Sequence, residues 1–403
     1  MKQLRFTALA AACLIAYGAA QAQEAVRPDV GKPLQAAQEL IKAGKYKDAL
    51  TKVREADAVG GKNANESYLV ERMRIAAASG AGDNDTAARS FEALAATGKV
   101  APADKARMAE SISGGYYRAK DYARAMQWGQ RYFKEGGTSG SMRTLLIQSQ
   151  YLSGDYAGAA RELTGEIQAA EKAGTPPAQD RLNLLLNAAS QLKDPGATVF
   201  ALERLVTYYP KKEYWVDLLS RMQRKPGFSD RLVLDTYRLS LATGSMSSAS
   251  DFMEMSQLAL QAGHELEAKQ VVDKGFATGV LGTGAEADRH KRLRDLVMKR
   301  IDEAKAARAA AESEANAAKD GNALVSLGFS TALGGDSAKG LQMMQQGIAK
   351  GSLKRPEDAK LHLGVAQVLA GDAKAQATLK SVGGADGTAE LARLWSLYAR
   401  RKG

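Results

Sequence analysis

Apolar and polar positions follow a helical period along most of this chain. Periodic segments of about 12 to 18 residues are separated by short breaks that contain glycine, such as Gly60-Gly61 and Gly334-Gly335. Glycine directly after a periodic run ends a helix, and aspartate after the break caps the next one, as we expect at Asp83, Asp155 and Asp336. No stretch alternates apolar and polar residues over six positions among β-branched types. The pattern therefore predicts an essentially all-α protein.

A short phrase with a tyrosine three residues before an alanine returns along the chain. It occupies residues 44–49, 120–125 and 154–159, and Tyr122 and Tyr156 are 34 residues apart. This is the period of a helix–turn–helix repeat. A stack of such repeats offers a binding surface and seldom a catalytic pocket.

These segments resemble tetratricopeptide (TPR) repeats. The Leu-Gly pair of the first repeat helix stands at Leu327-Gly328 and at Leu363-Gly364, each followed by a Gly-Asp turn, whereas residues 175–248 fit the period badly. The resemblance implies a right-handed superhelical solenoid of antiparallel helix pairs. After a signal peptide at 1–22, we expect an N-terminal repeat stack at 23–284. Its repeats are clearest at 30–57, 106–139 and 140–173 and divergent at 175–248. A long connecting helix at 285–319 follows, and then C-terminal repeats with a capping helix at 320–403.

Residues 285–319 contain neither glycine nor proline and are rich in Ala, Glu, Lys and Arg. A single helix near these positions is either a spacer between two stacks or a helix that pairs with a partner or a second copy. The tail carries Leu391, Leu394, Trp395 and Tyr398 on one helical face. We expect it to cap the last repeat, with partner binding as the alternative.

The first residues have the features of a secretory signal. Lys2 and Arg5 precede an apolar run over 6–20, and Ala20-Gln21-Ala22 is a small-x-small cleavage site. We expect cleavage after Ala22 and a periplasmic protein without a membrane span. Two alternatives stay open: an uncleaved anchor, for which the run is short of the roughly 20 residues required, and a lipoprotein acylated at Cys13.

The composition argues against cysteine-based sites and against nucleic-acid binding. Cys13 is the only cysteine, so the mature chain has no thiolate for a disulfide, a metal or catalysis. Lys and Arg number 56 against 45 Asp and Glu, a net charge of +11, or +9 without Lys2 and Arg5 (11 − 2). A basic exported protein is attracted to acidic partners or anionic polymers. No basic tract with interleaved aromatics suggests nucleic acid.

The three histidines do not form a metal motif. His264, His290 and His362 lie far apart in sequence; we expect His290, in a charged run, to be solvated, and His264 to be a turn residue. The chain has no nucleophile elbow, phosphate loop or dinucleotide fingerprint. We therefore predict no enzyme, no cofactor and no metal.

A recognition surface is the remaining candidate site. In TPR-like repeats the concave face is built mainly by the first helix of each unit. The resemblance places six residues there: Arg107, Glu110, Tyr117, Thr144, Gln148 and Tyr151. Tyr117 and Tyr151 are again 34 residues apart, and tyrosine is a favoured anchor for peptides. Ordinary packing between helices is the alternative for both rings.

The resemblance implies a non-enzymatic periplasmic scaffold that mediates protein–protein interaction in an envelope assembly, such as secretion, export or TonB-type energy coupling. The partner would be a protein or peptide of the cell envelope, with no nucleic acid and with possible self-association through the long helix. The alternative is a basic structural protein that binds the wall or an anionic polymer.

Overall fold

The computed structural model describes residues 25–400, which form 20 α-helices and one short 3-10 helix, with no strand among them. The expected all-α solenoid of helix pairs is confirmed, and so is one long helix near residues 285–319. The proposed signal peptide and Cys13 lie outside the described residues.

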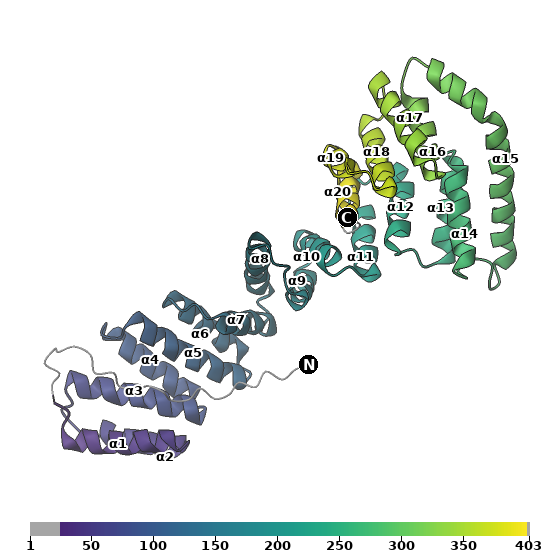
Figure 1. Ribbon diagram of the computed structural model, residues 1–403. Helices are drawn as coiled ribbons and strands as arrows, with labels where there is room; N and C mark the ends of the chain where they lie inside the picture. Colours follow the sequence, from purple (N-terminus) through teal and green to yellow (C-terminus); the bar gives the residue numbers. More distant parts are fainter. Residues whose placement is uncertain (1–24, 401–403) are drawn as a thin grey trace. The chain divides into compact units, whose positions relative to one another are not determined.

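The chain divides into two compact units, each described here by itself (Figure 1). Unit 1 contains residues 25–169 with 187–194, and unit 2 contains 170–186 with 195–400. The first eight helices are α1 (Pro28–Lys42), α2 (Tyr46–Asp57), α3 (Ala64–Ala81), α4 (Asn84–Ala96), α5 (Pro102–Arg118), α6 (Tyr122–Lys134), α7 (Gly140–Ser153) and α8 (Tyr156–Lys172).

Helix pairs in unit 1 are joined by short turns in which aspartate begins the second helix. The side chains of Asp83, Asp121 and Asp155 each accept a hydrogen bond from the backbone N–H three residues later, at 3.1, 3.0 and 2.8 Å. Such a cap satisfies a backbone donor that the first helical turn leaves free. Aspartate therefore marks where helices α4, α6 and α8 begin, and the repeated phrase marks where α2, α6 and α8 begin.

Successive pairs of unit 1 approach closely where a small residue receives a side chain from the preceding pair. Tyr46, the first residue of α2, packs on α3 at Gly80, where a Cβ would lie 2.2 Å from the tyrosine ring. Asn84, the first residue of α4, does the same on α5 at Gly115. A larger residue at either glycine would force the pairs apart.

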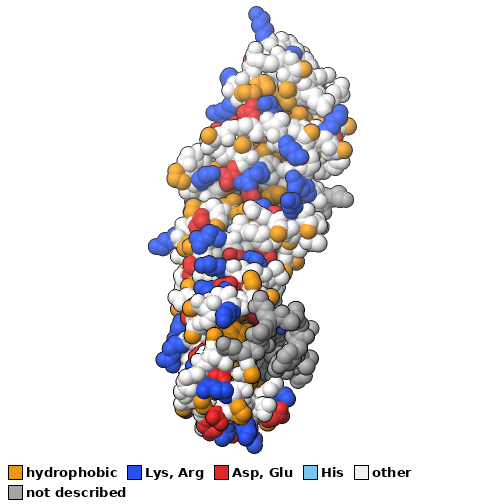
Figure 2. All heavy atoms as spheres, turned by 90° about the vertical axis from the view of Figure 1, so that its left-hand side faces the viewer, with side chains coloured by type: hydrophobic (Ala, Val, Ile, Leu, Met, Phe, Trp, Pro, Cys, Tyr) orange, Lys and Arg blue, Asp and Glu red, His pale blue; other side chains and the backbone are white. Residues whose placement is uncertain are grey.

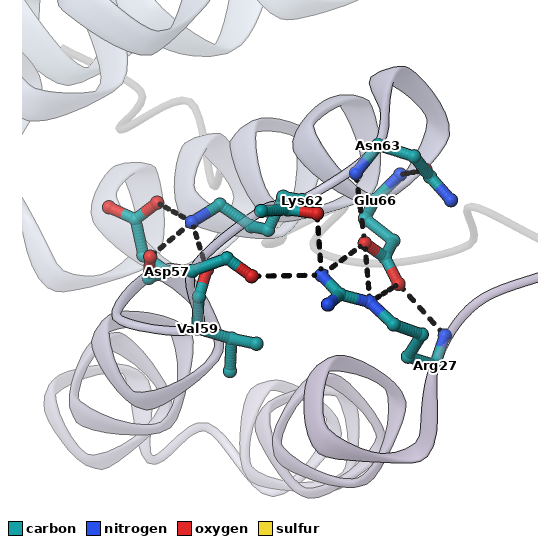
Figure 3. A network of polar contacts seen from close by, with 8 residues as sticks. Arg27, Asp57, Val59, Lys62, Asn63 and Glu66 are labelled. Carbon is teal, nitrogen blue, oxygen red and sulfur yellow. Dashed lines mark hydrogen bonds and ion pairs between the residues drawn. The ribbon is translucent and has the colours of Figure 1, made fainter.

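A polar network joins the segment before α1 to the beginning of α3 (Figure 3). The Arg27 side chain donates to both carboxylate oxygens of Glu66, and one of its Nη atoms also reaches the carbonyls of Gly60 and Gly61 at 3.2 and 3.0 Å. Asn63 and Glu66 form a capping box at the N-terminus of α3. Glu66 is 0% exposed, so its charge depends on these donors.

Unit 2 begins with the last residues of α8 and the first part of α9, and it continues to residue 400. Its elements are α9 (Gln179–Leu192), whose second part belongs to unit 1, α10 (Pro195–Tyr208), α11 (Lys212–Gln223), η1 (Asp230–Leu232), α12 (Val233–Thr243), α13 (Ala249–Gln261), α14 (Glu265–Ala277), α15 (Ala287–Ala317), α16 (Asn322–Leu333), α17 (Ser337–Lys350), α18 (Pro356–Ala370), α19 (Ala375–Lys380) and α20 (Thr388–Ala399). The segment 175–248, which fits the repeat period badly, holds α9 to α12 and η1.

The long helix α15 packs within unit 2. Leu293 and Val297 are buried against the core of α13 and α14, and Ala315 is buried with Leu324 and Met343. Helix α14 also contacts α16 directly. The two compact units divide within 169–195. The division that the sequence suggested on either side of 285–319 stays a prediction.

The last helix, α20, packs on α18 and α19 and also on α10 and α12, which precede it by more than a hundred residues (Figure 1). Leu391, Leu394 and Trp395 are fully buried in this core. Arg231, just before α12, donates to Asp358 at 2.8 Å and to Asp386 at 2.7 Å. The C-terminal helix thus closes unit 2 onto its own earlier helices.

The Arg27–Glu66 network should make the stability of unit 1 depend on pH. Hydrogen bonds from Arg27 lower the pKa of Glu66 from 4.5 to about 2. A carboxylate with a lowered folded-state pKa stabilises the fold above its unfolded pKa, and this contribution declines as the pH falls from 4.5 towards 2. We expect Glu66→Gln to lower the melting temperature clearly at pH 7 and much less at pH 2.5, as followed by circular dichroism.

The matched control is Glu39→Gln, which removes a carboxylate from the exposed Lys42–Glu39 pair. Exposed pairs contribute little, so its melting temperature should stay near that of the wild type at both values of pH. An equal loss for both variants at pH 7 would contradict the role of the buried network.

Candidate functional site

The six residues expected on a concave face lie on α5 and α7, and we call them the α5–α7 face. Each is partly or fully exposed: Arg107, Glu110, Tyr117, Thr144, Gln148 and Tyr151. Helices α5 and α7 contact each other directly, as α3 and α5 do. The first helices of successive pairs are therefore neighbours, as a continuous face of unit 1 requires.

The structure joins two of these residues by a hydrogen bond. The Tyr117 hydroxyl donates to Gln148 Oε1 at 2.9 Å, from α5 to α7. Burial of the hydroxyl raises the pKa of Tyr117, and the neighbouring Tyr122 adds to the effect. The bond fixes the Tyr117 ring beside the next helix pair.

Each of the two tyrosines on the α5–α7 face packs edge-on against a tyrosine of the repeated phrase. The Tyr117 and Tyr122 rings are 5.5 Å apart at 65°, and the Tyr151 and Tyr156 rings are 5.3 Å apart at 74°. Both Tyr117 and Tyr151 remain partly exposed. One edge of each ring therefore contributes to packing, while another remains accessible to a partner.

Glu110 is the carboxylate of the α5–α7 face. It is partly buried, and burial raises its pKa. Within the described chain it has no hydrogen bond or ion pair, whereas Arg107, 69% exposed, pairs with Asp104 on its own helix. One turn further along α5, Gly114 has no side chain, and the nearest atom to a Cβ there would be Arg118 Nη1 at 3.4 Å.

Leu152 is a surface residue that the sequence analysis did not single out. It follows Tyr151 on α7 and is 49% exposed, one of the most exposed large apolar side chains among the described residues. The sequence pattern around Leu152 did not mark it as a binding residue, because single exposed leucines are common on protein surfaces. Its position beside Tyr151 adds apolar area to the face.

One expectation about the histidines is corrected. His290 is not solvated: it is 4% exposed, and its Nδ1 accepts the backbone N–H of Gly282 at 3.0 Å. The tight turn before α15 needs this acceptor, which outweighs the charged sequence around the histidine. His264 does stand in a turn, at the N-cap of α14, but it is buried.

His264 and His362 border a buried charged cluster in unit 2. Arg238 of α12 donates to both oxygens of Glu267 at 2.7 Å and to Asp235 at 2.6 Å. The Asp235 carboxylate lies 3.0 Å from His362 Nε2. Phe329 stacks on His362 with ring centroids 4.4 Å apart. Arg238 pairs with both carboxylates and His362 contacts Asp235, so these contacts position four helices in the interior of unit 2.

We find no group of three His, Cys, Asp or Glu residues placed to hold a metal ion within residues 25–400. Two open hollows lie in unit 2, the larger of about 560 Å³ between α13 and the start of α15. Over the same residues, no helix has the length and the apolar character needed to cross a bilayer.

No protein-family model and no curated protein match the chain. Several solved structures do match the chain. The crystal structure of yeast Tom70 is 10% identical with a TM-score of 0.26, and the match covers 93% of this chain and 96% of that one. The TPR domain of P58(IPK) is 13% identical with a TM-score of 0.23, covering 93% and 98%. Naa15/Naa10 bound to HypK-THB is 16% identical with a TM-score of 0.27, covering 90% and 58%. A TPR domain is among them, but TM-scores below 0.5 carry no argument about this chain.

The buried His264 should make unit 2 sensitive to acid. Burial, together with the nearby charge of Arg238, lowers the pKa of His264 from 6.5 to about 3. Because the unfolded state takes up the proton first, stability should fall as the pH decreases from 6.5 towards 3, with a slope of up to about 1.4 kcal/mol per pH unit from this residue. Urea unfolding of a Trp128→Phe variant, followed by tryptophan fluorescence, would report on unit 2 alone, because the remaining tryptophans, Trp215 and Trp395, both lie there. His264→Gln should reduce the slope, and an unchanged slope would contradict this account.

The Tyr117–Gln148 bond can be tested by its effect on stability. Tyr117→Phe leaves Gln148 Oε1 without its donor, so we expect a loss of about 0.5–1.5 kcal/mol in the free energy of unfolding of unit 1. Tyr151→Phe is the matched control, because the Tyr151 hydroxyl has no hydrogen bond to a described residue. Urea titration monitored by circular dichroism measures both, and equal effects would show that the bond contributes nothing.

Proposed function

We propose that this chain is a non-enzymatic scaffold that binds a protein segment on the α5–α7 face of unit 1. One observation carries the proposal: Tyr117 and Tyr151, at the same position in consecutive helix pairs, each keep part of the ring exposed on adjoining helices. Their phenolic edges, together with Leu152, give a partner rigid apolar area at a low cost in conformational entropy.

The apolar side chains around the C-terminal helix of unit 2 are covered. In unit 2, α20 packs between α10, α12 and α18 and buries Leu391, Leu394 and Trp395. The apolar side chains gathered there already have an intramolecular partner. The α5–α7 face of unit 1 has Glu110 without any partner among the described residues, so unit 1 is the better candidate for binding.

The proposal places the scaffold in the periplasm, in an envelope assembly that serves secretion, export or TonB-type energy coupling. The support is the sequence of the signal, with its basic start, apolar run and Ala20-Gln21-Ala22 cleavage site. Self-association through α15 belongs to the same proposal, because Leu296 and Met298 are exposed on this helix.

Binding to an anionic polymer has less support than binding to a protein. A polymer-binding surface needs a continuous field of one sign. On the face drawn in Figure 2, Lys and Arg side chains are interspersed with Asp and Glu and with apolar residues. Much of the basic charge of unit 1 is also paired locally, for example Arg124 with Asp85 and Asp121.

A photoreactive benzoylphenylalanine at position 151 tests the proposal in cells. We expect ultraviolet irradiation to trap one discrete protein adduct, identified by mass spectrometry, because the ring would lie at the interface with the partner. The control places benzoylphenylalanine at position 92 instead of Glu92, which is exposed on α4. Adducts at position 92 alone, or the same adducts at both positions, would exclude the α5–α7 face as the binding site.

A further inference from the structure

We infer that the segment bound on the α5–α7 face carries a lysine or arginine side chain that pairs with Glu110, an inference that rests on the proposed function. The partner class is therefore a cationic segment of a protein, bound in an extended conformation.

The inference starts from the charges of α5. Asp104 pairs with Arg107, and Lys105 lies 3.9 Å from Glu135. Glu110 stands one turn further along the same helix and has no counterion among the described residues. A partly buried carboxylate without a counterion loses hydration and gains nothing in exchange, so a cation brought by a partner would be favourable there.

Two of the cations on these helices are already paired with carboxylates, whereas Arg72 and Arg118 make no ion pair with a described residue. Arg107 is held by Asp104. Arg143 of α7 pairs with Glu162 at 2.6 Å and lies 4.6 Å over the Phe133 ring. Arg72 of α3 lies 5.6 Å over the Tyr68 ring and makes no ion pair with a described residue. None of these cations neutralises Glu110, so the carboxylate keeps its negative charge for a ligand.

The neighbours of Glu110 fit an extended backbone. Gln148 Oε1 accepts from Tyr117, and this orients the Gln148 amide group with its two N–H donors unused by any described residue. Gly114, on the stretch of α5 between Glu110 and Tyr117, carries no side chain, and the nearest atom to its Cβ position is Arg118 Nη1 at 3.4 Å. A backbone carbonyl can accept from Gln148 while a cationic side chain of the same segment reaches Glu110.

The test is selection from a phage library of random 12-residue peptides on the immobilised full chain. On the wild type we expect lysine or arginine to be enriched at one fixed position. On Glu110→Lys we expect aspartate or glutamate at that position instead. Glu92→Lys makes the same change of charge at an exposed residue of α4 without a partner in the described chain, and it should select the wild-type consensus.

A synthetic peptide of the wild-type consensus then measures the pair. Glu110→Gln should weaken its binding about tenfold, replacing the peptide's cation by alanine should weaken it equally, and the two changes together should cost no more than either one. Because Glu110 has no partner to lose within the described chain, thermal unfolding of Glu110→Gln should match the wild type. A loss of binding accompanied by misfolding would count against the inference.

The remaining outcomes separate this inference from the proposed function. Selected peptides that lack a fixed cation, but lose binding to Tyr151→Ala, would overturn the role of Glu110 and leave the binding face in place. Peptides that bind Tyr151→Ala unchanged, or no enrichment on the wild type, would overturn both.

Discussion

The structure depends on the close contact between successive helix pairs, because no pair can bury its apolar side alone. In unit 1 this contact is made where the first residue of a pair's second helix enters the space left by a glycine on the next pair, as Tyr46 does at Gly80 and Asn84 at Gly115. The contact sets the spacing of the pairs. It therefore also sets which residues of neighbouring helices, such as Tyr117 and Gln148, come within hydrogen-bond reach.

At the end of a stack, the last helix pair has no following pair to cover its apolar side. Unit 2 covers this side by folding back, with α20 packed on α10 and α12 as well as on its neighbours in sequence. Arg231 links this closure to Asp358 and Asp386, and the buried Arg238 cluster ties α12 to α14 and α18 inside it. An apolar surface that could serve a partner is converted into core, and the charges needed to hold the closure are paired internally.

The sequence predicted features that arise from local chemistry. The turns were found because an aspartate caps the following helix, as Asp121 and Asp155 do. The α5–α7 face, inferred from the 34-residue spacing of Tyr117 and Tyr151, stays a prediction as a binding site. What the sequence missed depends on residues far apart in the chain. Arg231 and Asp358 are 127 residues apart, so no local pattern predicts the docking of α20. His290 appears solvated in its charged run, and only the fold shows the Gly282 N–H that requires its Nδ1.

Glu110 shows why local stability and binding make different demands on one helix. Replacing its carboxylate by an apolar group would remove an unpaired charge from a partly buried position, and pairing it internally, as Asp104 is paired with Arg107, would neutralise it. Neither has happened, although cations stand on the same and adjoining helices. A scaffold needs at least one interaction that is incomplete until the partner arrives, since a face that is fully satisfied in the free protein gains little from binding. Under the proposed function, Glu110 would give the face its preference between partners, and Tyr117 and Tyr151 would supply the area on which a partner rests.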